Sequence, residues 1–199
     1  LPALSNSNAQ GEYYLTDIIA MAVDHGLSVT VSQPLNPFEV QGVNNRLQLA
    51  ELERWYQRQQ AERLMTEGAS LADPARIEVR GELTIGNDLW IDVNAVFEGR
   101  VSLGNNVVIG PNCVIKDATI ADGAEIKANS VIEGAVVGAN AQIGPFARLR
   151  PGTELAANTK VGNFVETKKA VVGEGSKINH LSYVGDASLG RNVNVGAGT

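Results

Sequence analysis

The stretch IGPNCVIKDATIADGAEIKANSVIEGAVVGANAQIGPFARL, residues 109–149, carries the pattern that decides the fold. The apolar residues that recur in it at regular spacing are Ile109, Ile115, Ile120, Ile126, Ile132, Val137, Ile143 and Leu149. They belong to sets of three spaced by six positions, and successive sets begin 17 or 18 residues apart. A sandwich of ordinary strands does not keep a six-residue period over such a length, whereas a solenoid does.

The same period begins at Ile85 and continues to Val195. A small residue usually follows four places after each apolar one: Ala95, Cys113, Ala124, Ser130, Ala141, Ala147, Ser176 and Ser182. Three short strands per coil, joined by tight turns, direct the apolar residues to a common axis, while small residues fit where the walls converge. We therefore predict a mostly β protein, a left-handed parallel β-helix of hexapeptide repeats. Cys113 occupies one of the interior positions, which favours a buried packing residue over a reactive thiol.

Two segments of different character precede the repeats. Residues 46–67 contain no Gly or Pro and favour a helix, with Asn44 or Asn45 as its cap and Gly68 at its end. Leu49, Leu52, Tyr56 and Leu64 are spaced for one face of this helix. We interpret it as a solvated connecting helix. Residues 1–45 combine a helix over 16–24 with a strand-like run over 27–31 and are too sparse in apolar residues to fold alone. We expect three parts: residues 1–45, the connecting helix over 46–67, and the β-helix domain over 68–199.

The charge and cysteine content narrow the class of protein. A formal net charge of -6 disfavours nucleic acid and anionic membranes as partners. The single cysteine fits a reducing compartment, and neither a membrane-length apolar run nor a signal segment is visible, so we expect a cytoplasmic protein. The sequence begins at Leu1 without Met and ends at Thr199 partway through a coil, without a polar cap. We expect a piece of a longer protein.

Basic residues gather in the least regular coils. Between Pro145 and Tyr183 they are Arg148, Arg150, Lys160, Lys168, Lys169 and Lys177. Residues one coil apart stack, and Arg150 and Lys168 are 18 positions apart, so they are in register. The pair is interpreted either as a site for a phosphate or other anion or as two solvated surface charges.

The two histidines differ in their settings. His25 follows the first predicted helix, as a helix-terminal surface residue does. His180 lies in a turn region near Tyr183, where it is either a base that takes a proton from an amine or a packing residue. Two histidines are too few for the three-histidine zinc sites of carbonic-anhydrase-like β-helices, and no other zinc spacing is present.

Several stretches resemble one enzyme family. IGPFARLRPGT, VGNFVETKKA, INHLSYVGDA and NVNVGAGT are similar to the bifunctional N-acetylglucosamine-1-phosphate uridylyltransferase / glucosamine-1-phosphate N-acetyltransferases. NAQGEYYLTD and EVQGVNNRLQL resemble the end of the α/β nucleotidyltransferase domain and the start of the linker helix in that family. The resemblance runs through essentially the whole chain. It implies that residues 1–45 are the tail of that domain.

The resemblance also implies roles for individual residues. His180 would deprotonate the 2-amine of glucosamine 1-phosphate for attack on acetyl-CoA. The substrate would be held by Arg150, Lys168, Tyr183 and Asn194, and Ala197 would contact acetyl-CoA through its backbone. Asn44 would be one ligand of the Mg²⁺ that serves the UTP-dependent uridylyl transfer. The family forms homotrimers with sites between subunits.

The sequence departs from the family at both ends. The aspartate that would share Mg²⁺ with Asn44 and the Gly-rich nucleotide loop are not in this sequence, so we predict no uridylyl transfer by these residues. Further acetyl-CoA contacts would lie beyond Thr199, so we expect acetyl transfer by this chain to be weak or absent. Two other readings stay open: a nucleotidyltransferase whose β-helix only regulates or oligomerises, and a purely structural trimer.

Overall fold

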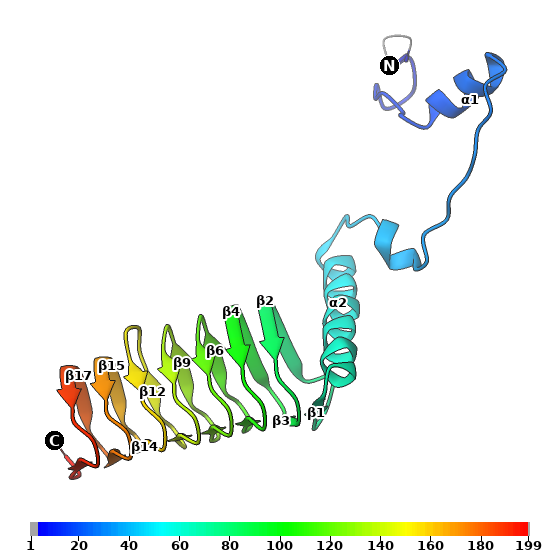
Figure 1. Ribbon diagram of the computed structural model, residues 1–199. Helices are drawn as coiled ribbons and strands as arrows, with labels where there is room; N and C mark the ends of the chain where they lie inside the picture. The colour runs from blue at the N-terminus through cyan, green and yellow to red at the C-terminus, as the bar shows by residue number, and fades with distance from the viewer. Residues whose placement is uncertain (1–3, 199) are drawn as a thin grey trace. The chain divides into compact units, whose positions relative to one another are not determined.

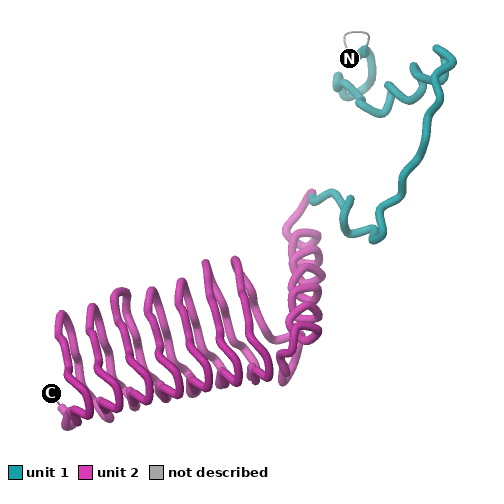
Figure 2. The backbone as a smooth tube through the Cα atoms, viewed as in Figure 1, with its two compact units in different colours: residues 1–43 teal, residues 44–199 magenta. Residues whose placement is uncertain are grey.

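The computed structural model describes residues 4–198, which fall into two compact units with the boundary along the chain between Val43 and Asn44 (Figure 2). The first unit holds α1 (Asp17–Asp24) and the short 3-10 helix η1 (Pro37–Val40). Residues 27–31, expected to be strand-like, form no strand, and neither does any other described residue before Asn44. A strand needs a hydrogen-bonding partner, and this segment supplies none.

The second unit consists of one helix, α2 (Arg46–Thr66), followed by coils of parallel strands stacked along one axis (Figure 1). One face of the solenoid is a sheet of β1 (Ala69–Leu71), β3 (Leu89–Ile91), β5 (Val108–Ile109), β8 (Glu125–Ile126), β11 (Gln142–Ile143), β14 (Lys160–Asn163), β16 (Lys177–His180) and β18 (Asn194–Val195). We call it the first face. Every pairing in it is parallel, and the partners lie one coil apart in sequence, as a β-helix requires.

Long strands bend from the second face to the third and join them into one sheet. The second face contains β6 (Val114–Lys116), β9 (Val131–Glu133), β12 (Arg148–Leu149) and the first halves of β2 (Ile77–Ile85), β4 (Ala95–Leu103), β15 (Glu166–Val172) and β17 (Tyr183–Leu189). The third contains β7 (Thr119–Ile120), β10 (Val136–Val137), β13 (Glu154–Leu155) and the second halves of the long strands. The parallel β-helix predicted from the hexads is therefore confirmed.

The interior follows the predicted positions closely. Residues of the six-residue period such as Ile109, Ile126, Ile143 and Ile178 have no exposed surface. The small interior residues are buried as well. Among them is Cys113, whose Sγ lies 3.2 Å from the carbonyl oxygen of Lys127. The solenoid begins ahead of the first hexad at Ile85 and within the expected part 68–199, because β1 and β2 already form a coil and bury Ala69, Ile77 and Leu83.

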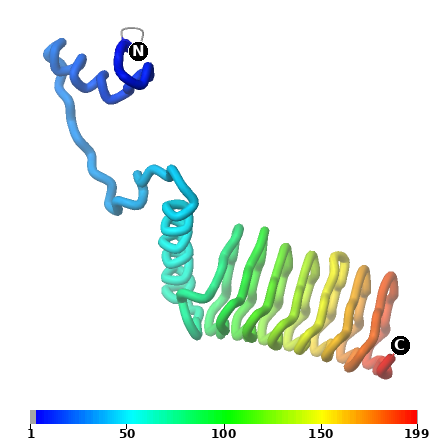
Figure 3. The backbone as a smooth tube through the Cα atoms, turned by 180° about the vertical axis from the view of Figure 1, so that it is seen from behind, coloured from blue at the N-terminus to red at the C-terminus, as the bar shows by residue number. Residues whose placement is uncertain are grey.

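Helix α2 covers the open end of this first coil (Figure 3). Asn45 caps the helix by accepting a hydrogen bond from the backbone N–H of Gln48. The buried residues are Gln57, Ala61 and Leu64, so only Leu64 of the apolar residues noted in the sequence is buried, and the expectation of a solvated helix is wrong on this side. The Gln57 side chain receives the Val79 N–H at 2.8 Å and donates to the Val79 carbonyl at 2.9 Å. It thus satisfies part of the free edge of β2.

No helix among residues 4–198 combines the length and hydropathy that crossing a membrane requires.

Candidate active site at one corner of the β-helix

The corner between the first and second faces carries a column of residues one coil apart. Asn163 at the end of β14 and His180 at the end of β16 are register partners. The residues that follow them, Phe164 and Leu181, turn the corner in the left-handed conformation, with φ of 55° and 46°. Continuing the 17-residue step between Lys177 and Asn194 places Ala197 one coil beyond His180. His180 and Ala197 therefore belong to one corner, as their predicted roles require.

The His180 ring is exposed and is held from one side. Its Nδ1 lies 2.7 Å from Oδ1 of Asn163. The Ser182 hydroxyl donates to the His180 carbonyl at 2.8 Å and fixes the backbone around the turn. This arrangement leaves Nε2 on the outer side of the ring, where it can meet a ligand.

Three of the predicted substrate residues share the second face. Arg148 and Glu166 are register partners, as are Leu149 and Thr167, so the next positions, Arg150 and Lys168, are also in register. The backbone N–H of Arg150 donates to the Thr167 carbonyl at 2.8 Å, in agreement with this alignment. The stacking of Arg150 on Lys168 that the 18-residue spacing predicts is therefore confirmed for the backbone.

The two cations differ in their charge balance. Nη1 of Arg150 donates to Oε1 of Glu166 at 2.8 Å. Lys168 has no ion pair among the described residues and is partly exposed. Lys168 is thus the cation of this pair that has a charge to offer an anionic ligand, while Arg150 shares its charge with Glu166.

Tyr183 is brought toward the same column by a glycine. Gly185 is the register partner of Lys168, and a Cβ atom at position 185 would overlap the Tyr183 hydroxyl. The phenol therefore leans along β17 over Gly185. Neither Gly185 nor Asn163 is singled out by spacing or charge, because their contributions depend on side-chain contacts.

Asn194 lies on the other side of the corner. It belongs to β18 on the first face, as the register partner of Lys177, and its Oδ1 accepts a hydrogen bond from Nδ2 of Asn179 at 3.1 Å. Adjacent faces of a triangular solenoid point in different directions. Within one chain, Asn194 and Lys168 therefore do not point toward the same ligand position above a flat face. A ligand that touches both must lie at the corner or be shared with another chain.

The remaining basic residues do not converge on one spot. Arg148 pairs with Glu133 at 3.6 Å, and Nζ of Lys169 lies 4.0 Å from Asp186. Lys160 and Lys177 are register partners on the first face. The predicted basic cluster is therefore split between two faces.

Asn44 lies just ahead of α2, outside the β-helix. Its backbone N–H donates to Oε1 of Gln48 at 2.8 Å, while Asn45 serves as the helix cap. Within residues 4–198 no group of three His, Cys, Asp or Glu side chains is placed to hold a metal ion. The described residues therefore offer one amide oxygen and no carboxylate cluster for Mg²⁺.

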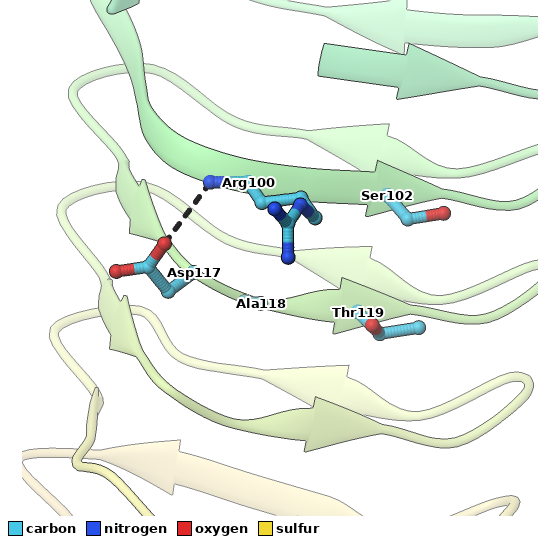
Figure 4. A pocket seen from close by; sticks show the side chains of 5 residues that line it. All are labelled: Arg100, Ser102, Asp117, Ala118 and Thr119. Carbon is cyan, nitrogen blue, oxygen red and sulfur yellow. Dashed lines mark hydrogen bonds between the residues drawn. The ribbon is translucent and has the colours of Figure 1, made fainter. Parts of the chain in front are cut away.

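Surface hollows on the described residues are open and shallow. One of about 280 Å³ is lined by Arg100, Ser102, Asp117, Ala118 and Thr119 (Figure 4). There Oδ1 of Asp117 accepts a hydrogen bond from the backbone N–H of Arg100 at 3.0 Å. None of the predicted site residues lines this hollow. Another, of about 400 Å³, lies beside the corner and includes Lys177, Asn179 and Asn194. The site thus lies on an open surface, not in an enclosed cavity.

These features define a class, the hexapeptide-repeat β-helix proteins, with a histidine at one corner. A family model described as the GMPPB C-terminal domain matches residues 79–156. The whole chain is 61% identical to part of the bifunctional protein GlmU of Stutzerimonas stutzeri, and 98% of it is 60% identical to GlmU of Pseudomonas entomophila. The chain belongs to the GlmU family and corresponds to a C-terminal part of these proteins. It spans 44% and 43% of their lengths.

Among solved structures, a mutant of AntD, an N-acyltransferase from Bacillus cereus, is 14% identical, with a TM-score of 0.48 over 50% of this chain and 71% of its own. The acetyltransferase domain of PglB from Neisseria gonorrhoeae is 18% identical, with a TM-score of 0.40 over 67% of this chain and 61% of its own. Similarities of this size do not extend to function.

Proposed function

We propose that this chain carries the acceptor side of an acetyltransferase site, which transfers an acetyl group from acetyl-CoA to the amine of glucosamine 1-phosphate. The proposal depends chiefly on one observation. An exposed histidine, oriented by a hydrogen bond at Nδ1, adjoins a face on which Lys168 forms no ion pair with any residue from 4 to 198. Membership of the GlmU family supports the choice of sugar and acyl donor.

In this proposal His180 is the general base. Its Nε2 takes a proton from the sugar amine as the amine nitrogen attacks the thioester carbonyl carbon. The tetrahedral intermediate collapses, the carbon–sulfur bond breaks, and the coenzyme A sulfur leaves and takes up a proton. A neutral imidazole suits this role near pH 7.

The acceptor is held through its phosphate and its hydroxyl groups. We assign the phosphate to Lys168 and Arg150, whose charges lie in one column of the second face. Tyr183, which leans over Gly185, and Asn194 would supply hydrogen bonds to the sugar. The backbone of Ala197, one coil from His180, would contact acetyl-CoA.

A homotrimer would complete the site. Lys168 and Asn194 occupy different faces, and Phe146, Phe164 and Leu181 expose 48%, 57% and 63% of their surface along the same corner. A second chain packed against this corner would cover those apolar side chains and place further groups opposite His180.

For the whole protein we propose a second activity, uridylyl transfer from UTP to the acetylated product. Asn44 would contribute one oxygen ligand to its Mg²⁺, and the carboxylate partner would come from residues outside this chain. The 199 residues alone would then show no uridylyl transfer and weak or no acetyl transfer. In this proposal the reaction takes place in the cytoplasm.

Calorimetric titration with glucosamine 1-phosphate tests the acceptor site in this chain. We expect binding by the unaltered chain and at least a tenfold weaker affinity for Lys168→Met, because a hydrogen bond between charged groups is worth about 1.5–3 kcal/mol. Lys160→Met, which removes a lysine from the neighbouring face, is the control and should bind normally. Absence of binding by the unaltered chain would support a β-helix that is only structural or regulatory.

A further inference from the structure

The residue beside His180 on the preceding coil is an amide. Asn163 and His180 are register partners at the ends of β14 and β16, so their side chains leave the backbone at the same corner, one strand spacing apart. The Leu181 N–H donates to the Asn163 carbonyl at 3.2 Å and continues the ladder around the turn. The backbone thus places the two side chains together.

The contact between them selects one form of the ring. Oδ1 of Asn163 lies 2.7 Å from Nδ1 of His180, and an amide oxygen can only accept a hydrogen bond. Nδ1 must therefore carry the proton, which leaves the lone pair on Nε2. The opposite tautomer would bring two acceptors together and would leave no lone pair at the outer nitrogen.

Charged groups near the His180 ring do not select its tautomer. Glu166, at the start of the preceding strand β15, is engaged by Arg150, and Lys177 lies three residues before His180 on β16. The hydroxyl of Tyr183 lies over Gly185. Among the described residues, Asn163 alone is hydrogen-bonded to the His180 ring.

We propose that Asn163 is a positioning residue, which holds His180 as the Nδ1–H tautomer with Nε2 free to accept the proton of the substrate amine. The catalytic role of Asn163 rests on the proposed function, whereas the assignment of the His180 tautomer is independent of it. A neutral acceptor fixes the tautomer without the added stabilisation of the imidazolium that a carboxylate would give.

Nitrogen NMR of the ¹⁵N-labelled 199-residue chain at pH 8 tests the tautomer without any turnover. His25 is an internal reference, because its Nδ1 lies 2.7 Å from the Met21 carbonyl oxygen, an acceptor that also requires Nδ1–H. We expect both rings to show a protonated Nδ1 in the unaltered chain. In Asn163→Ala only His180 should change, toward a mixture of tautomers, and Asn163→Asp, which keeps an acceptor, should restore it.

The catalytic consequence is measured in the full-length protein. We expect Asn163→Ala to lower kcat for acetyl transfer by about 10- to 100-fold, with KM nearly unchanged. Gln142→Ala, which removes an exposed amide from the same face, is the matched control and should keep both the tautomer and kcat. A protonated Nε2 in the unaltered chain, or an unchanged His180 spectrum in Asn163→Ala, would overturn the inference. Failure of the proposed function is a distinct outcome: the unaltered full-length protein would then transfer no acetyl group.

Discussion

Arg150 and Glu166 form an ion pair across one coil of the β-helix, with Nη1 of Arg150 and Oε1 of Glu166 at 2.8 Å. Both side chains keep about a third of their surface exposed, 34% and 36%, so water screens the pair. The carboxylate nevertheless competes with any anion that approaches Arg150 and Lys168. We therefore expect Glu166 to limit how much positive charge this face offers to a phosphate.

Replacing Glu166 with Gln should strengthen phosphate binding. Removal of one negative charge beside the Arg150–Lys168 column should raise the affinity for glucosamine 1-phosphate by about 3- to 10-fold at low salt, and less at high salt. Calorimetry at two ionic strengths measures the change. Glu174→Gln, which releases Arg191 from a 2.7 Å pair elsewhere on the β-helix, is the control. A weaker affinity in Glu166→Gln would show that Glu166 orients Arg150 and does not compete with the ligand.

Tyr183 should lose its position when Gly185 gains a side chain. A Cβ at residue 185 overlaps the Tyr183 hydroxyl, so Gly185→Ala should turn the phenol away from the Lys168 column. We expect about tenfold weaker binding of glucosamine 1-phosphate, equivalent to the loss of about one hydrogen bond, with unchanged circular dichroism. Gly190→Ala is the matched control, because the nearest atom to its added Cβ is 4.0 Å away. Equal affinities of the two variants would contradict a role for Tyr183.

Gln57 should protect the first coil from opening. Gln57→Ala leaves the Val79 N–H and carbonyl without their side-chain partners, at a cost of about 2–4 kcal/mol. Because a solenoid opens locally, amide hydrogen exchange of β2 is the suitable measurement, and we expect its protection to fall while that of β14 stays the same. Gln59→Ala removes an exposed glutamine of the same helix and should change neither strand.

Cys113 should be chemically silent in the folded chain. Burial raises the pKa of its thiol above the ordinary 9.0. At pH 8 iodoacetamide should therefore modify it only after denaturation. The unfolded thiol loses its proton at a lower pH than the folded one. The contribution of Cys113 to the free energy of unfolding is therefore fully present below about pH 9 and falls as the pH rises further. Rapid labelling of the native chain at pH 8 would show that the coil opens near Cys113.

The solenoid and its register follow from arithmetic on the sequence. A constant step of 17 or 18 residues already aligns Arg150 with Lys168, and the structure keeps that alignment. The start of the solenoid is harder to predict, since Pro74 interrupts the period between β1 and β2. Handedness was inferred from the hexapeptide pattern and stays a prediction.

Contacts between elements account for what the sequence does not predict. The buried face of α2 depends on the coil beneath it, where Gln57 finds a backbone partner that no hydrophobic pattern reveals. The run at 27–31 has strand-like alternation but no neighbour to pair with. The Asn163–His180 bond requires both a shared corner and specific side-chain rotamers, so the sequence indicates the histidine without its partner.

The most direct test of the acetyltransferase proposal is the rate of acetyl transfer by the full-length protein with His180 replaced by Gln, measured with acetyl-CoA and glucosamine 1-phosphate. We predict a fall of roughly 10²- to 10⁴-fold in kcat, the usual contribution of a general base, with uridylyl transfer intact. Acetyl transfer at the rate of the unaltered protein would contradict the assignment of His180 and of the corner around it.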